Sequence, residues 1–97
     1  MNKQRVLTLL SQHRDEIAKK FAAKDLALFG STARGEARED SDVDVLVEFE
    51  GPATFDGYMG LKFYLEDLFH AKVDLVTEDA VKPRMRPIIE KDMIHVA

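Results

Sequence analysis

Residues 42 to 48 carry the pattern that most limits how this chain can fold. Valines recur there with a period of two, at Val43, Val45 and Val47, and this alternation of β-branched side chains predicts a β-strand. Side chains two apart in a strand project from one face, about 7 Å apart. Asp42 and Asp44 therefore converge opposite the valines. Two such close carboxylates repel each other unless a cation lies between them, so the pair predicts a site for Mg²⁺.

Composition limits the classes of protein that this chain can belong to. Its 97 residues suffice for one compact domain, and a net charge of −4 argues against a free-standing nucleic-acid binder, which needs basic patches. With no cysteine, neither a disulfide framework nor a thiolate zinc site can form. No apolar run approaches membrane-spanning length, and no export signal is visible. We therefore expect a cytoplasmic protein with no membrane partner and no direct contact to nucleic acid.

Periodicity along the chain predicts a mixed sheet with helices packed against it. An apolar stripe at steps of three and four predicts a helix from about Lys3 to Ala23, and residues 26–29 read as a buried strand ended by Gly30. Residues 31–41 are polar and are expected to form a loop or one helical turn. Further on, the sequence predicts a helix capped by Thr54, a strand at residues 73–76, a short helix near Pro87 and a last short strand at residues 94–96.

The resulting order of elements is α-β-β-α-β-α, which places the chain in the α/β (α+β) class. No repeat, linker or low-complexity tract divides the sequence. We predict a single domain over residues 1–97, in which residues 1–23 form the N-terminal helix and residues 24–97 form the core.

The acids and a nearby glycine together suggest chemistry on phosphates. Nucleotidyl transfer uses two metal ions about 3.5–4 Å apart, held by shared carboxylates. Asp42 and Asp44 fit the shared ligands, and Asp74 is a candidate third ligand, because an isolated acid in an otherwise apolar strand is costly to bury without a partner. Gly30 allows the backbone to approach a phosphate closely, and the Ser31 hydroxyl can donate to its oxygens.

Two arginines in the polar segment, Arg34 and Arg38, could neutralise a triphosphate. Loop arginines are also commonly solvated without a ligand, and both interpretations stay open. An acid pair on a strand is likewise often a solvated face without a ligand. Here the upstream Gly30 and Ser31 and the later Asp74 favour a nucleotide site.

Residues 30–47, with the sequence GSTARGEAREDSDVDVLV, resemble the signature of the DNA polymerase beta-like nucleotidyltransferase superfamily, in the form carried by its minimal nucleotidyltransferases. The resemblance continues through residues 72–76 and 82–83. It implies Mg²⁺-dependent transfer of AMP from ATP to a hydroxyl. Many such proteins are encoded beside a HEPN ribonuclease toxin and act as its antitoxin by adenylylating a tyrosine of the toxin, so a hetero-oligomer is possible.

By this resemblance, Asp42 and Asp44 bind two Mg²⁺ ions, Asp74 completes the metal site and helps to activate the acceptor, and Gly30 with Ser31 holds the triphosphate. Two other functions remain open from the sequence: a binding module that neutralises its partner by occlusion, and an enzyme that modifies a small-molecule hydroxyl. Because 97 residues leave little surface for an acceptor, we expect a partner protein to complete that side of the site.

Overall fold

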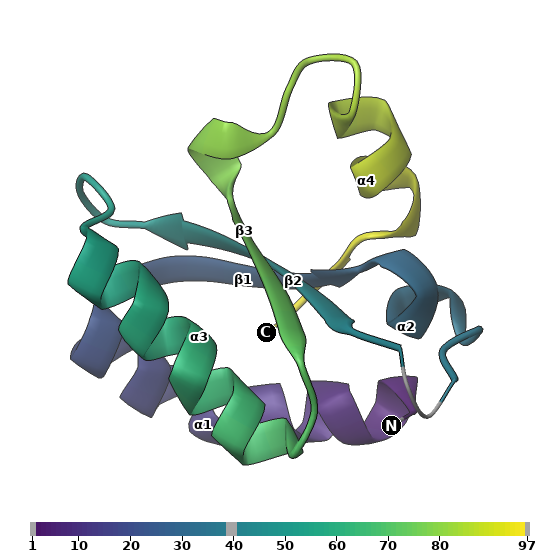
Figure 1. The fold of residues 1–97 in the computed structure, drawn as a ribbon, viewed down its shortest axis with the longest axis horizontal. Coiled ribbons are helices and arrows are strands. Elements are labelled where there is room, and N and C mark those ends of the chain that lie inside the picture. The colour runs from purple at the N-terminus through teal and green to yellow at the C-terminus, as the bar shows by residue number, and fades with distance from the viewer. Residues whose placement is uncertain (1, 39–40, 97) are drawn as a thin grey trace.

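The structure is a computed structural model that describes residues 2–38 and 41–96 (Figure 1). The predicted first helix is α1, Lys3–Phe21, and it begins where the Asn2 side chain accepts a hydrogen bond from the backbone N–H of Arg5. Val6, Leu10 and Ile17 of its predicted apolar stripe are buried. The helix ends at Ala22, whose left-handed backbone turns the chain directly into the first strand.

The remaining elements follow the predicted sequence of helices and strands. Thr54 caps the second long helix as predicted, because its hydroxyl accepts a hydrogen bond from the N–H of Gly57. The last helix has proline in its first turn, as the sequence predicted. The bounds are β1 Ala23–Phe29, α2 Gly30–Arg34, β2 Val43–Phe49, α3 Phe55–Phe69, β3 Val73–Thr77, the 3₁₀ turn η1 Glu78–Ala80, α4 Arg86–Asp92 and β4 Ile94–His95.

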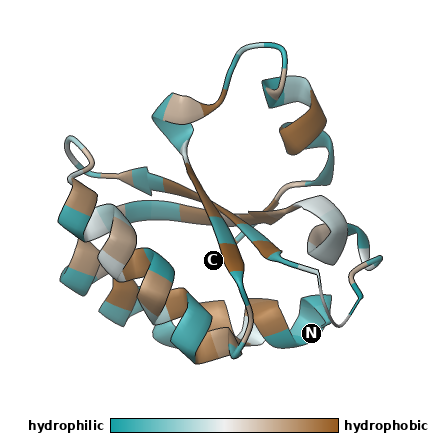
Figure 2. Ribbon diagram, in the orientation of Figure 1, coloured by the Kyte–Doolittle hydropathy of each residue, from teal (hydrophilic) through white to brown (hydrophobic). Residues whose placement is uncertain are grey.

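The predicted mixed sheet is confirmed, with strand order β3-β2-β1-β4. Strand β1 pairs antiparallel with β2 and with β4, whereas β2 and β3 run parallel. Figure 1 shows α1 and α3 below the sheet and α4 above it. The core lies between the sheet and α1 and α3, where Val45, Leu28, Leu61 and Leu65 have no exposed surface. In Figure 2 the strands carry hydrophobic stretches, whereas the loop leading to α4 is largely hydrophilic.

The observed order adds three short elements, α2, η1 and β4, to the predicted α-β-β-α-β-α scheme. Gly30 and the first four residues of the polar segment, 31–34, form α2, a short helix where a loop or one helical turn was expected, and Gly30 and the following Gly35 both have positive φ. The last element, β4, matches the predicted final strand. Within residues 2–38 and 41–96, no helix is both long enough and apolar enough to cross a membrane.

Candidate functional site

The sheet brings two of the predicted acids side by side on neighbouring strands, with the third just before one of these strands, and we call Asp42, Asp44 and Asp74 the aspartate row. Asp44 on β2 is the register partner of Asp74 on β3 and, on its other side, of Phe29 at the end of β1. Asp42 lies one residue before β2 begins. The parallel pairing of β2 with β3 is the reason that two acids 30 positions apart in sequence lie side by side. All three carboxylates therefore gather where β1 ends and where β2 and β3 begin.

The electrostatics of Asp44 reflect this crowding. The pKa of Asp44 is raised from 3.8 to about 6, first by burial and then by the negative charges of Asp74 and Asp42. The positive charge of Arg34 opposes the shift but does not cancel it. A cation bound between these carboxylates would favour the ionised form of Asp44.

These acids fit a hard divalent cation by their chemistry, because carboxylate oxygens are the ligands that Mg²⁺ prefers. Their geometry is less complete: within the described residues, no three His, Cys, Asp or Glu side chains are arranged as ligands of one ion. Asp44 and Asp74 are register partners on paired strands, and Asp42 lies two residues before Asp44. The role of these three aspartates as metal ligands therefore stays a prediction.

Gly30 lies directly against the Asp44 side chain. A Cβ atom at this position would lie 2.0 Å from Oδ2 of Asp44, and the backbone φ is +74°. Both facts require glycine, first because a side chain would displace the Asp44 carboxylate and second because the left-handed region disfavours other residues. Ser31 follows in the first turn of α2 and is half-buried. The two predicted phosphate-contacting residues are thus adjacent to the predicted metal ligands.

The two predicted arginines are placed differently. The guanidinium of Arg34 donates to Glu36 in the following loop at 3.0 Å and to Asp92 of α4 at 2.9 Å, and the second contact joins α2 to α4. Arg34 could contact a triphosphate by exchanging one of these carboxylates for a phosphate. Arg38 lies in the exposed loop after α2, and its side chain has no ion-pair partner among residues 2–38 and 41–96. The sequence offered no signal for Asp92, which lies 58 positions from Arg34.

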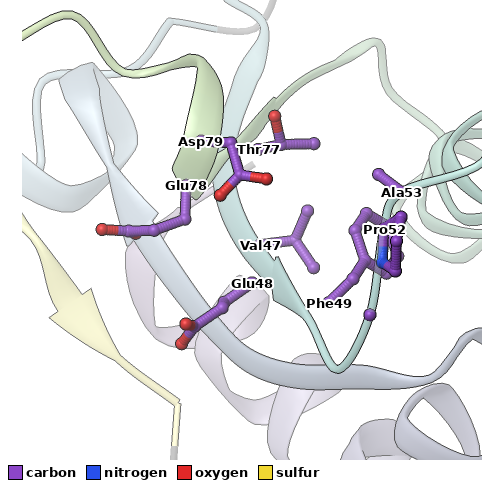
Figure 3. Close-up of a pocket in the computed structure, with 9 residues that line it drawn as sticks. Val47, Glu48, Phe49, Pro52, Ala53, Thr77, Glu78 and Asp79 are labelled. Atoms are coloured by element: carbon purple, nitrogen blue, oxygen red, sulfur yellow. The ribbon is translucent and has the colours of Figure 1, made fainter.

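A separate hollow of about 400 Å³ lies toward the other end of β2 and is lined by Val47, Glu48, Pro52, Glu78 and Asp79, among others (Figure 3). The figure shows Asp79 on one side of Val47, with Pro52 and Ala53 on the other. Its acidic side chains would repel a triphosphate, so this hollow does not compete with the aspartate row as a nucleotide site.

The small mixed sheet carries paired acids, Asp44 and Asp74, and a glycine whose backbone lies against Asp44. This combination is typical of proteins that act on nucleotides. The chain matches the nucleotidyltransferase domain family over residues 10–96, and it belongs to that family. It is 36% identical over 89 residues to the protein adenylyltransferase MntA of Thermococcus cleftensis, covering 92% of this chain and 90% of that protein. The predicted membership is confirmed, and the protein is a nucleotidyltransferase by class.

Solved structures share the fold. One, described as a candidate minimal nucleotidyltransferase, superposes with a TM-score of 0.81 at 37% identity, over 97% of this chain and 95% of its own. Another comes from a complex of a tri-AMPylated Shewanella oneidensis HEPN toxin with an MNT antitoxin. It has a TM-score of 0.68 at 15% identity, over 94% of this chain and 71% of that chain. At this identity the second likeness establishes the fold alone.

Proposed function

We propose that this nucleotidyltransferase transfers AMP from ATP, with Mg²⁺, to a tyrosine hydroxyl of a HEPN-type toxin, and that it thereby acts as an antitoxin. One observation carries the proposal: Gly30 lies in contact range of Asp44, which in turn is paired with Asp74. A backbone that can approach a phosphate thus lies beside carboxylates that can hold its metal ions. The relative named as a protein adenylyltransferase and the toxin–antitoxin complex with the same fold support the choice of acceptor.

Each part of the site has a distinct task in this reaction. Asp42, Asp44 and Asp74 would hold the metal ions, which neutralise charge on the phosphates when bound. Gly30 and Ser31 would hold the triphosphate next to them, through the backbone and the hydroxyl. Asp74 occupies the β3 side of the row, away from Gly30, where an incoming hydroxyl could give up its proton. Arg34 and Arg38 remain candidate phosphate contacts.

The proposal is tested by incubating the protein with α-labelled ATP, Mg²⁺ and the product of the neighbouring gene. We expect label on that product with the wild-type protein. The double variant Asp42→Asn plus Asp44→Asn should lose activity at least about a hundredfold, since asparagine keeps the shape but cannot hold the ions. A double variant of exposed acids on α1, Asp15→Asn plus Glu16→Gln, serves as the charge-matched control. Label transfer that survives removal of both aspartates would overturn the mechanism.

The same variants separate catalysis from occlusion. If the chain neutralises its partner by modifying it, the variant lacking both aspartates should fail to protect cells that express the toxin. Full protection by that variant would instead favour a binding module. Transfer of label to an added aminoglycoside, with none to the partner protein, would favour the small-molecule alternative.

A further inference from the structure

Arg34 links the predicted phosphate contacts to the last helix. It is the final residue of α2, the short helix that begins at Gly30, and its Nη1 donates to Oδ2 of Asp92 at 2.9 Å. Asp92 is the final residue of α4, and Figure 1 shows α4 above α2. The two helices are in contact. A residue 58 positions along the chain thus holds an arginine of the helix that carries Gly30 and Ser31.

Asp92 is itself fixed by the fold. Two residues after Asp92 the chain enters β4, where Ile94 pairs with Leu28 of β1. Strand β1 ends at Phe29, and α2 follows at once. Both partners of the contact between Arg34 and Asp92 are therefore tied to the same end of β1, one through the chain and the other through strand pairing. Side chains placed by helices and strands keep their geometry better than side chains on loops.

We propose that Asp92 is a positioning residue for nucleotide binding: it holds the guanidinium of Arg34 in the orientation that contacts the triphosphate, and it keeps this contact when the nucleotide is bound. This inference rests on the proposed function, since it assumes that ATP binds beside Gly30 and Ser31. Asp92 would act only through Arg34 and would touch neither the nucleotide nor its metal ions.

The guanidinium of Arg34 has one edge that suits a phosphate. Nε donates to Glu36 at 3.0 Å and Nη1 donates to Asp92, whereas Nη2 has no hydrogen-bond partner among residues 2–38 and 41–96. Nε and Nη2 form the same edge of the planar group, and such an edge can give two parallel hydrogen bonds to a phosphate. A phosphate that replaced Glu36 would therefore bind this edge while Nη1 stayed with Asp92.

The exposure of the two carboxylates indicates which of them gives way. The Glu36 side chain is 66% exposed, and exposed ion pairs contribute little, so a triphosphate with several negative charges can replace it. The Asp92 side chain is only 19% exposed, and removing its partner would leave a largely buried charge unpaired. Asp92 is therefore the carboxylate that Arg34 keeps.

Arg34 lies close enough to the aspartate row to act on it. Burial raises the pKa of Asp44 to about 6, and the positive charge of Arg34 opposes this rise. A long arginine side chain loses much rotamer freedom when a ligand fixes it, and a contact that fixes it in advance lowers this cost of binding. Removing Asp92 should thus weaken nucleotide binding, even though it also removes a negative charge.

Three variants that each remove one negative charge test the inference through binding alone. Calorimetry gives the Kd of a non-hydrolysable ATP analogue with Mg²⁺ for Asp92→Asn, Glu36→Gln and Glu90→Gln. Glu90 is the matched control on α4, because it is exposed and contacts Arg86. We expect Asp92→Asn to raise the Kd about tenfold, Glu36→Gln to leave it equal or lower it, and Glu90→Gln to keep it within about twofold of wild type.

Two results of this titration would refute the inference. If Asp92→Asn binds the analogue as tightly as Glu90→Gln or more tightly, the charge of Asp92 governs binding rather than its hold on Arg34. If Glu36→Gln raises the Kd as much as Asp92→Asn does, Glu36 is an anchor and does not give way to the phosphate. Urea denaturation at the temperature of the titration checks that each variant is folded.

A double variant separates action through Arg34 from a general effect of Asp92 on the fold. In protein that carries Arg34→Gln, adding Asp92→Asn should change the Kd by less than about twofold, because the group that Asp92 holds is gone. A further rise of about tenfold would refute the inference, because Asp92 would then act independently of Arg34.

The inference and the proposed function fail separately. In AMP transfer to the product of the neighbouring gene, we expect Asp92→Asn to raise the KM for ATP about tenfold and to change kcat by less than about threefold. A fall in kcat with an unchanged KM for ATP would refute the inference alone. A raised Kd in Asp92→Asn, with no AMP transfer by the wild-type protein, would support the inference and refute the proposed function. Failure of the wild-type protein to bind the analogue would refute both.

Discussion

At the scale of single residues, Gly30 and Asp44 compete for the same space. The expected result of Gly30→Ala is loss of AMP transfer by about a hundredfold or more, because the new methyl group would lie 2.0 Å from Oδ2 of Asp44 and must push that carboxylate out of the row. Initial rates of label transfer measure the effect.

Gly35→Ala is the matched control for that substitution. Gly35 has nearly the same backbone φ, +76°, but a Cβ there would meet nothing within 4 Å. Both variants should lose about 1 kcal/mol of stability from the left-handed backbone, and Gly35→Ala should keep its activity. Equal losses of activity in the two variants would show that backbone strain, rather than contact with Asp44, is what matters.

The raised pKa of Asp44 makes a second prediction at this scale, concerning stability without metal. Because Asp44 binds its proton more tightly when folded, with a pKa of about 6 against 3.8, its contribution to stability is lost as the pH rises from about 4 to 6. An asparagine side chain at this position would carry no charge at any pH. Asp44→Asn should therefore raise the free energy of unfolding at pH 7.5 but not at pH 4. The shift of about two pKa units limits this gain in the free energy of unfolding to about 3 kcal/mol. Because Asp44 is partly exposed, we expect a gain of roughly 1 kcal/mol.

Urea denaturation at both pH values, in chelator, checks this prediction, with Asp15→Asn on the exposed side of α1 as the control. Adding Mg²⁺ at pH 7.5 should then raise the melting temperature of the wild-type protein and leave that of Asp44→Asn unchanged. Equal stabilisation of both proteins by Mg²⁺ would mean that the ion binds elsewhere.

At the scale of elements, α3 protects the outer edge of the sheet. Strand β3 is an edge strand, yet the Tyr58 hydroxyl donates to the carbonyl oxygen of Leu75, and Glu66 accepts from the N–H of Val73 at 3.1 Å. These two side chains satisfy backbone groups that would otherwise be free to pair with another chain. They also fix the strand that carries Asp74.

Removing one of these bonds should therefore destabilise the protein measurably. Tyr58→Phe leaves the Leu75 carbonyl without its donor, and we expect a loss of about 1–2 kcal/mol in the free energy of unfolding. Tyr64→Phe is the control on the same helix, since its hydroxyl contacts the exposed Glu16, and its loss should be below about 1 kcal/mol. A larger loss in Tyr64→Phe, measured by urea denaturation, would contradict this account of the edge.

Local patterns predicted most elements, because each carried a physical signal of its own. Alternating valines identified β2, the Thr54 hydroxyl identified the start of α3, and Pro87 identified the start of α4. The five-residue α2 had no such signal: a segment this short cannot display a helical period, and its two flanking glycines equally suit a loop. Strand order could not be read from sequence either, because pairing depends on contacts between distant segments.

The candidate site was predictable to the same extent. Its acids and Gly30 stand out because acids in apolar strands and a glycine after a strand are locally unusual. Their shared row, however, comes from the pairing of β2 with β3. The contact of Arg34 with Asp92 depends on where α4 docks, which no local pattern encodes. The site roles of all these residues remain predictions for the experiments above.

At the scale of the whole molecule, the N-terminal helix and the C-terminal segment both contact β1. Val96 is buried, its N–H donates to the carbonyl of Leu26 at 2.9 Å, and its own carbonyl accepts from Nε of Arg14 on α1 at 3.1 Å. Helix α1 packs on the same strand and contributes Val6, Leu10 and Ile17 to the shared core. The N-terminal helix and the C-terminal segment therefore stabilise each other through β1, which argues that α1 and the sheet on which it packs unfold together.

Val96→Ala tests whether the molecule is one cooperative unit. Truncating this buried side chain should cost about 1–3 kcal/mol, whereas His95→Ala, at the neighbouring exposed position, removes a contact with Asp25 and should cost below about 1 kcal/mol. If the chain is a single domain, Val96→Ala should lower the urea midpoint equally for probes placed on α1 and on α4. A urea midpoint that falls for the probe on α4 but keeps its wild-type value for the probe on α1 would contradict the single-domain prediction. Helix α1 would then be stable without the packing of Val96.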